Sequence, residues 1–139
     1  MTDLAVLFAE YERALLASPV VARFTVLKRR IIERAGFMRV RAELTNGGLL
    51  EFSEFWNTED NDETTLRKYT YHWQTAGGQL MRRWDNAPHH PELPHAPHHV
   101  HPGDEAPEGN LQPPTLQTVL AEIEAKLSSA NNNDIVATD

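Results

Sequence analysis

The chain has 139 residues, of which 40% are hydrophobic, and a formal net charge of −7. This length suits one domain with one hydrophobic core and is too short for two domains. The chain contains no cysteine, which excludes disulfides and thiolate metal sites and favours the cytoplasm.

The charge is distributed unevenly along the chain. Residues 20–86 carry eleven Lys/Arg against nine Asp/Glu, whereas residues 87–139 carry one lysine against eight acidic residues. The middle of the chain is thus mildly basic, which is compatible with an RNA-binding surface and equally with an ordinary mixed surface. No apolar run approaches eighteen residues, and no basic segment precedes the first apolar residues. We therefore expect a cytoplasmic protein that does not enter a membrane.

The first and last elements are expected to be amphipathic helices. Residues 2–17 place apolar side chains at the spacing of one helical face, and Ser18-Pro19 ends the pattern. Thr115 is a candidate N-cap for a second helix that extends to Leu127. Residues 128–139 have too few apolar side chains to pack on a core, so we expect a disordered tail there after a single domain over 1–127.

Between the helices, the hydrophobic pattern predicts about five antiparallel strands, over residues 20–33, 38–44, 49–56, 66–74 and 79–84. Asn46-Gly47-Gly48 and Gly77-Gly78 mark two hairpin turns, because these residues tolerate a positive φ. The expected fold class is therefore α+β: an antiparallel sheet of about five strands with the N- and C-terminal helices packed on one face.

An acidic residue interrupts the apolar face of the strand over 49–56. Glu54 shares that face with Leu50, Phe52 and Trp56, so its carboxyl group is expected to be half-buried and to need a partner. Such a residue is more often a member of a structural ion pair than a catalyst, and we leave Glu54 out of the candidate site.

Six of the seven histidines follow the last predicted strand, at His89, His90, His95, His98, His99 and His101. The prolines at positions 88, 91, 94, 97 and 102 exclude a helix or a central strand, so residues 87–104 are expected to form a stiff loop. Because imidazole titrates near neutral pH and binds transition metals, this loop is a candidate edge of an active site.

In the second hairpin, strand alternation separates two faces. One face carries Tyr69, Tyr71, Trp73, Leu80, Arg82 and Trp84, and the opposite face carries Lys68, Thr70, His72, Met81, Arg83 and Asp85. The second face offers a histidine to move a proton and cations to stabilise a phosphate, which is what phosphodiester cleavage without a metal requires. A solvated sheet face with an incidental histidine would show the same pattern.

For an enzyme of this kind, the predicted catalytic residues are His72, His89, His90 and Arg83. One of His89 and His90 would work with His72, one as base on a ribose hydroxyl and the other as acid on the leaving oxygen. The predicted substrate contacts are Lys68, Tyr71, Trp73, Arg82 and Trp84. No cofactor is expected. The alternative is zinc or another divalent metal bound by histidines of the loop, from among His95, His98, His99 and His101, and a loop with only adventitious metal affinity is also compatible.

Five strings of the sequence are specific enough to indicate a family. They are Gly36-Phe-Met-Arg-Val-Arg-Ala-Glu-Leu, Gly48-Leu-Leu-Glu-Phe-Ser-Glu, Tyr71-His-Trp-Gln, Arg83-Trp-Asp-Asn-Ala-Pro-His-His and Pro97-His-His-Val-His. Together they resemble the TumE-like toxin family of bacterial and archaeal type II toxin–antitoxin systems, over roughly residues 4–127. The resemblance implies a small cytoplasmic toxin encoded beside an antitoxin that neutralises it, with RNA cleavage as the activity usually suspected.

We therefore expect a toxin that acts as a metal-independent endoribonuclease through histidine acid–base chemistry. Its expected partners are a cognate antitoxin and RNA, and a second copy of the chain is a further candidate. Two alternatives stay open: a histidine-ligated, metal-dependent hydrolase or nuclease, and a protein-binding module without enzymatic activity.

Overall fold

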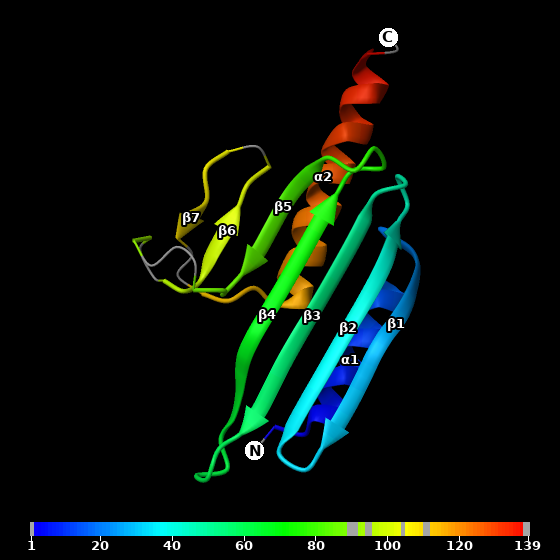
Figure 1. Ribbon diagram of the computed structural model, residues 1–139. Helices are drawn as coiled ribbons and strands as arrows, with labels where there is room; N and C mark the ends of the chain where they lie inside the picture. The colour runs from blue at the N-terminus through cyan, green and yellow to red at the C-terminus, as the bar shows by residue number, and fades with distance from the viewer. Residues whose placement is uncertain (1, 89–91, 94–95, 104, 110–111, 138–139) are drawn as a thin grey trace.

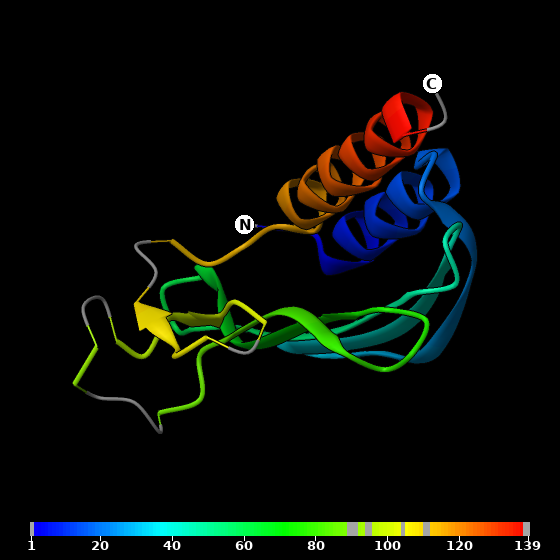
Figure 2. The ribbon, with the colours of Figure 1, turned by 90° about the horizontal axis from the view of Figure 1, so that it is seen from above.

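The fold is one antiparallel sheet with two helices on one of its faces (Figures 1 and 2). It was obtained as a computed structural model that describes residues 2–88, 92–93, 96–103, 105–109 and 112–137. The helices are α1 (Leu4–Ala17) and α2 (Leu116–Ala137). The strands are β1 (Val21–Ile32), β2 (Ala35–Leu44), β3 (Leu49–Thr58), β4 (Thr64–Gln74), β5 (Leu80–Asp85), β6 (His99–His101) and β7 (Glu108–Gly109).

The strands lie in the order β1-β2-β3-β4-β5-β6-β7, so every strand pairs with its neighbours in the sequence. All of these pairs are antiparallel. The predicted α+β class and the placement of both helices on one face are confirmed. The sheet has seven strands among the described residues, where the sequence predicted about five.

α1 begins where the sequence predicted and packs one face on the sheet. The side chain of Asp3 accepts hydrogen bonds from the backbone N–H groups of Ala5 (3.0 Å) and Val6 (3.2 Å), which satisfies donors that the first turn of a helix leaves without partners. The buried residues of α1 are Leu4, Phe8, Tyr11 and Leu15. They repeat every three or four positions, as the predicted helical face requires.

α2 begins after the predicted N-cap. The Thr115 hydroxyl accepts from the backbone N–H of Thr118 (3.1 Å), and the Thr118 hydroxyl accepts from the backbone N–H of Thr115 (3.0 Å). Composition predicted a disordered tail over 128–139, whereas the backbone of residues 128–137 continues α2. Once packing has nucleated a helix, each further hydrogen bond requires the backbone of only one more residue to be fixed, so polar residues can prolong the helix.

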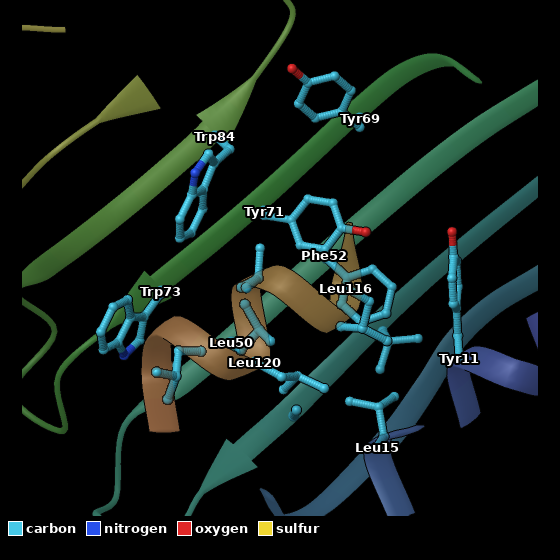
Figure 3. Packing of buried hydrophobic residues seen from close by; sticks show 14 of the residues in the cluster. Tyr11, Leu15, Leu50, Phe52, Tyr69, Tyr71, Trp73, Trp84, Leu116 and Leu120 are labelled. Atoms are coloured by element: carbon cyan, nitrogen blue, oxygen red, sulfur yellow. The ribbon is translucent and has the colours of Figure 1, made fainter. Parts of the chain in front are cut away.

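The hydrophobic core lies between the helices and the facing side of the sheet. Alternate residues of β2, β3 and β4 are buried there, among them Val40, Phe52 and Tyr71. Figure 3 shows aromatic and aliphatic side chains from these strands gathered beneath α2 and beside Tyr11 of α1. Each large apolar side chain that is fully buried contributes roughly 1.5–3 kcal/mol to folding. No helix formed by the described residues covers the opposite face of the sheet (Figure 2), and we call it the open face.

The histidine segment contains a strand that the sequence did not predict. Residues 87–104 were expected to form a loop because of their prolines, but His99–His101 form β6 between β5 and β7. Pro97 and Pro102 lie just outside these three residues, so the backbone N–H groups that the ladder needs are all present. His89, His90 and His95 lie outside the described residues. In the part of the chain that the structure describes, neither helix has the length and apolar character needed to cross a bilayer.

Candidate functional site on the open face

Cross-strand pairing aligns polar side chains in two neighbouring rows on the open face. The first row runs from β2 to β6 through Arg41, Glu51, His72, Arg83 and His101. The second row runs beside it through Arg39, Ser53, Thr70, Asp85 and His99. We call these ten residues the polar rows. Side chains directly opposite each other on antiparallel strands have Cβ atoms about 4.5–5.5 Å apart, so members of a row interact.

His72 and Arg83 form the centre of the first row. The His72 Nε2 donates to Oε1 of Gln74 (2.9 Å), because a carboxamide oxygen can only accept. In the neutral imidazole the other nitrogen, Nδ1, then carries a lone pair, and it lies 3.4 Å from Nη1 of Arg83. His72 is half-buried. The guanidinium can only donate, so in this arrangement Nδ1 of His72 accepts a hydrogen bond from Arg83.

Arg83 is held in place from its other side by Asp85. Its Nε lies 3.3 Å from Oδ2 of Asp85, and the Arg83 side chain is 41% exposed while that of Asp85 is buried. A planar guanidinium fixed through Nε still presents its terminal N–H groups for bidentate contact with a phosphate. Arg83 therefore has a defined orientation between the two histidines of its row.

Asp85, His99 and His101 form a compact cluster at the β5–β6 end of the rows. The Asp85 Oδ1 lies 2.9 Å from Nε2 of His99, and Oδ2 lies 3.8 Å from Nε2 of His101. Their three candidate ligand atoms all lie within 4.8 Å of one another, which is close enough to hold one metal ion. The cluster combines two imidazoles with one carboxylate, a donor set that suits zinc and related divalent ions.

At the other end of the rows, Glu51 binds two arginines. Its carboxylate accepts from Nη2 of Arg39 (3.3 Å) and Nη2 of Arg41 (3.1 Å). Both guanidinium groups are about half exposed. A depression of about 320 Å³ lies between Arg39 and the His72–Arg83 pair. Its lining combines charged, hydroxyl and amide groups with the apolar residues Leu49 and Phe52.

The comparisons with known proteins identify the family. The model of the family described as Toxin TumE matches residues 11–128. The chain belongs to the TumE toxin family. It is therefore a toxin of a toxin–antitoxin system, and its partner is an antitoxin. Neither the search of the curated proteins nor the search of the solved structures returned a match.

The structure places most of the predicted substrate contacts of this toxin away from the open face. Tyr71, Trp73 and Trp84 are buried in the core beneath the helices (Figure 3), so none of them can stack on a substrate in this conformation. Arg82 lies on the same face and pairs with Glu122 of α2 (2.8 Å). The alternation correctly grouped these residues, but it did not reveal that the helices cover their side of the sheet. We therefore withdraw all four from the site.

The remaining predicted residues are distributed differently. Lys68 is exposed on the open face, opposite Phe55 and one position beyond the rows. His98, one of the alternative metal ligands, is engaged elsewhere, since its Nδ1 lies 2.9 Å from the Tyr69 hydroxyl and its ring stacks on Tyr69. The roles predicted for His89 and His90, and for His95 as a ligand, fall outside the described residues and stay predictions.

Sequence reasoning missed Arg39, Arg41, Glu51 and Asp85 as site residues. Apolar and charged residues alternate over 38–44, which puts both arginines on one face of their strand, and Asp85 was grouped with His72. The missing information was the register of five strands, which brings residues far apart in the sequence into one row. Asp85 also stabilises the chain that follows β5, since its Oδ1 accepts a hydrogen bond from the backbone N–H of Ala87 (3.0 Å).

Proposed function

We propose that this toxin is a metal-independent endoribonuclease whose reaction takes place on the polar rows. The observation that supports the proposal best is the order His72, Arg83, His101 within one row of three adjacent strands. Neighbouring strands are about 4.8 Å apart, so the backbones of the two histidines lie roughly 10 Å apart with Arg83 between them. A phosphate held by Arg83 would then have an imidazole on each side.

This order matches the demands of RNA cleavage by internal transfer. The ribose 2′-oxygen attacks phosphorus and the bond to the 5′-oxygen breaks, which requires a base for the 2′-hydroxyl proton and an acid for the leaving oxygen. His72 serves as the base through Nδ1, which carries the lone pair when Nε2 donates to Gln74. His101 serves as the acid, with the Asp85 carboxylate as its anionic neighbour. The products are a 2′,3′-cyclic phosphate and a 5′-hydroxyl.

Arg83 supplies the charge stabilisation in this proposal. Negative charge develops on the non-bridging phosphate oxygens as the 2′-oxygen attacks, and a fixed guanidinium stabilises it without having to reorganise. Arg39 and Arg41 lie on the same face on β2, three strands from Arg83, where they extend the cationic surface along the RNA. The polar rows themselves carry three arginines against two acidic residues, Glu51 and Asp85, so they do not share the acidic excess of the whole chain.

The proposal is tested with purified toxin, a defined single-stranded RNA and analysis of the product ends. His72→Ala should lower the cleavage rate by about 10²–10⁴-fold, the usual contribution of a general acid or base. His98→Ala is the matched control, because it removes a histidine that contacts Tyr69 instead of the rows. Circular dichroism shows whether each variant is folded.

Two results would count against a ribonuclease of this kind. Full cleavage by a folded His72→Ala variant would remove His72 from the mechanism. Products with a 3′-hydroxyl and a 5′-phosphate would show that water or hydroxide, and not the 2′-oxygen, attacks the phosphorus. If the toxin arrests growth without binding RNA, the proposed target changes from RNA to a protein.

A further inference from the structure

We propose that Asp85, His99 and His101 bind a zinc ion, and that zinc inhibits the toxin because it occupies His101. The inhibition rests on the proposed function, since it matters only if His101 donates a proton during RNA cleavage. The zinc site itself rests on geometry alone and can be tested by zinc binding, without an activity assay.

The spacing of the three side chains suits zinc. Zinc binds imidazole nitrogen at about 2.0–2.1 Å and carboxylate oxygen at about 2.0–2.2 Å, so ligand atoms around a tetrahedral ion lie about 3.4 Å apart. The Asp85 Oδ1 lies 2.9 Å from Nε2 of His99, and the other carboxylate oxygen, Oδ2, lies 3.8 Å from Nε2 of His101. One ligand atom from each residue lies within 4.8 Å of the other two. The two imidazole rings are also close, with centroids 4.9 Å apart. Small side-chain rotations would bring all three atoms onto one ion.

The orientation of His99 supports a cation at this point. Its Nδ1 lies 2.8 Å from the backbone oxygen of Pro97, and this nitrogen must donate because a carbonyl oxygen can only accept. Its Nε2 lies 2.9 Å from Oδ1 of Asp85, so two candidate ligand atoms are already directed at one point. A ligating histidine commonly donates its other N–H to a backbone carbonyl, which fixes the ring toward the metal.

Asp85 is fixed in a comparable way. Its Oδ1 accepts the backbone N–H of Ala87 and its Oδ2 contacts Nε of Arg83. Each carboxylate oxygen has two lone pairs, so one lone pair on each oxygen remains available for a metal. Asp85 and His99 therefore form a rigid, preorganised pair of ligands at the junction of β5 and β6.

The burial of the cluster is asymmetric, and the asymmetry indicates where a fourth ligand would enter. The side chains of Asp85 and His99 are 2% and 1% exposed, whereas that of His101 is 22% exposed. Three protein ligands with one accessible side leave a coordination position for water. That side belongs to the row of Arg83 and His72, so an ion bound there would face the proposed reaction centre.

Zinc bound to this cluster would interfere with catalysis in two ways. The lone pair of His101 Nε2 would be donated to the metal, so this nitrogen could no longer carry the proton for the leaving oxygen. The ion would also repel the guanidinium of Arg83, which lies 3.3 Å from the Asp85 carboxylate, and this would disturb the orientation of the phosphate contact. RNA cleavage should therefore fall as zinc occupies the site.

The binding test uses untagged, chelator-treated toxin and zinc sulfate, with equilibrium dialysis and titration calorimetry as readouts. The parent protein should bind one zinc ion per chain. His101→Ala should raise the zinc Kd by at least about 10–100-fold. Loss of a residue that only orients a metal ligand already lowers metal affinity by this factor, and loss of the ligand itself should lower it at least as much. We choose His101 over His99 for this substitution because His101 is partly exposed, so its replacement should disturb folding less.

Two controls separate this site from general affinity of the histidine segment. His98→Ala removes a neighbouring histidine that contacts Tyr69, and the triple variant His89→Ala, His90→Ala, His95→Ala removes the three histidines outside the described residues. Both should keep the Kd of the parent. The site is overturned if the toxin binds no stoichiometric zinc, or if binding survives in His101→Ala and is lost in the triple variant.

The activity test adds zinc to the RNA cleavage reaction. Parent toxin should lose activity at zinc concentrations that match the Kd from dialysis, and a chelator should restore it. Cleavage that is unchanged or stimulated at saturating zinc would overturn the inhibition while leaving the site intact. Stoichiometric zinc binding by a folded toxin that cleaves no RNA in any condition would overturn the proposed function and leave the zinc site standing.

Discussion

The hydroxyl group of Tyr11 on α1 donates a 2.6 Å hydrogen bond to Oε1 of Glu54 in the middle of β3. Trp56 Nε1 donates to the same oxygen (2.9 Å), and the Tyr71 hydroxyl donates to Oε2. Glu54 is almost fully buried. Burial raises the pKa of its carboxyl group above the usual value, and the three hydrogen bonds only partly oppose that effect. A polar link of this kind between helix and sheet makes stability depend on pH.

The first prediction follows from the raised pKa of Glu54. In the unfolded chain the Glu54 carboxyl group releases its proton near its ordinary pKa, whereas in the folded chain it releases the proton only at a higher pH. The stability that protonated Glu54 contributes is therefore fully present below the ordinary pKa and is lost as the pH rises through the folded pKa. Glu54→Gln cannot ionise and keeps a carbonyl oxygen for Tyr11 and Trp56. Its free energy of unfolding, relative to the parent, should therefore increase between pH 4 and pH 8, by roughly 1.4 kcal/mol for each unit of pKa shift. Urea titrations across this range measure the difference, and a difference independent of pH would contradict the prediction.

The second prediction concerns the donor from α1. Tyr11→Phe removes the hydroxyl and leaves a buried carboxyl oxygen with one donor fewer, which should destabilise the toxin by about 1–3 kcal/mol. At a pH above the folded pKa of Glu54, the loss should be smaller when the same substitution is made in the Glu54→Gln background, since hydrogen bonds to a neutral acceptor are weaker than those to a charged one. Chemical denaturation of the four proteins gives the coupling energy, and a coupling energy of zero would show that Tyr11 acts only through packing.

The third prediction tests the contact between α1 and β2. A Cβ atom added at Gly36 would lie 2.7 Å from Cδ1 of Leu4 and 3.3 Å from the Phe8 ring, so the Leu4 side chain would have to move and the Phe8 ring would have to shift. Gly36→Ala should destabilise the toxin by about 1–3 kcal/mol, the usual cost of overpacking. Gly77→Ala is the matched control in the β4–β5 turn, where the nearest atom would be 3.9 Å away, and it should change stability by no more than about 0.5 kcal/mol. Equal melting temperatures for the two variants would argue against close packing at Gly36.

Helical periodicity and strand alternation predicted much of the fold, because each of these patterns can be recognised within a few neighbouring residues. The spacing of Leu4, Phe8 and Tyr11 required one buried helical face, and the alternation around Tyr71 and His72 separated the two faces of β4 correctly. Glu54 was expected to be half-buried with an ionic partner. It is instead fully buried and bonded to hydroxyl and indole donors, one of which comes from a helix distant in the sequence.

The candidate site depends on longer-range information. His99 and Asp85 meet only because β6 pairs with β5, and the prolines beside β6 favoured a loop when each residue was judged locally. The aromatic face of β4 and β5 had the composition of a stacking surface for bases, and only the position of the helices shows that Trp84 belongs to the core. Alternation assigns residues to a common face but does not say which face is covered.

The last prediction concerns the charge and shape of Arg83. Its guanidinium contacts Asp85 through Nε and lies 3.4 Å from His72 through Nη1, so two edges of one planar group are used at once. Lysine offers a single point charge and cannot reproduce both contacts. Arg83→Ala should therefore lower the rate of RNA cleavage by about 10²–10³-fold, as loss of one charge-stabilising donor usually does, whereas Arg83→Lys should recover only part of that loss.

Salt dependence separates a phosphate contact of Arg83 from a purely structural role. Binding of single-stranded RNA weakens with salt by a slope of about −0.7 for each phosphate contact, in a plot of log K against log salt concentration. Arg83→Ala should make this slope shallower by about that amount, and Arg83→Lys should preserve it because the charge remains. The charge-matched control is Arg23→Ala on β1, which removes an exposed arginine paired with Glu43 outside the polar rows. If Arg83→Ala and Arg23→Ala have the same slope as the parent while Arg83→Ala has lost activity, Arg83 acts by orienting His72 and Asp85 and does not bind phosphate itself.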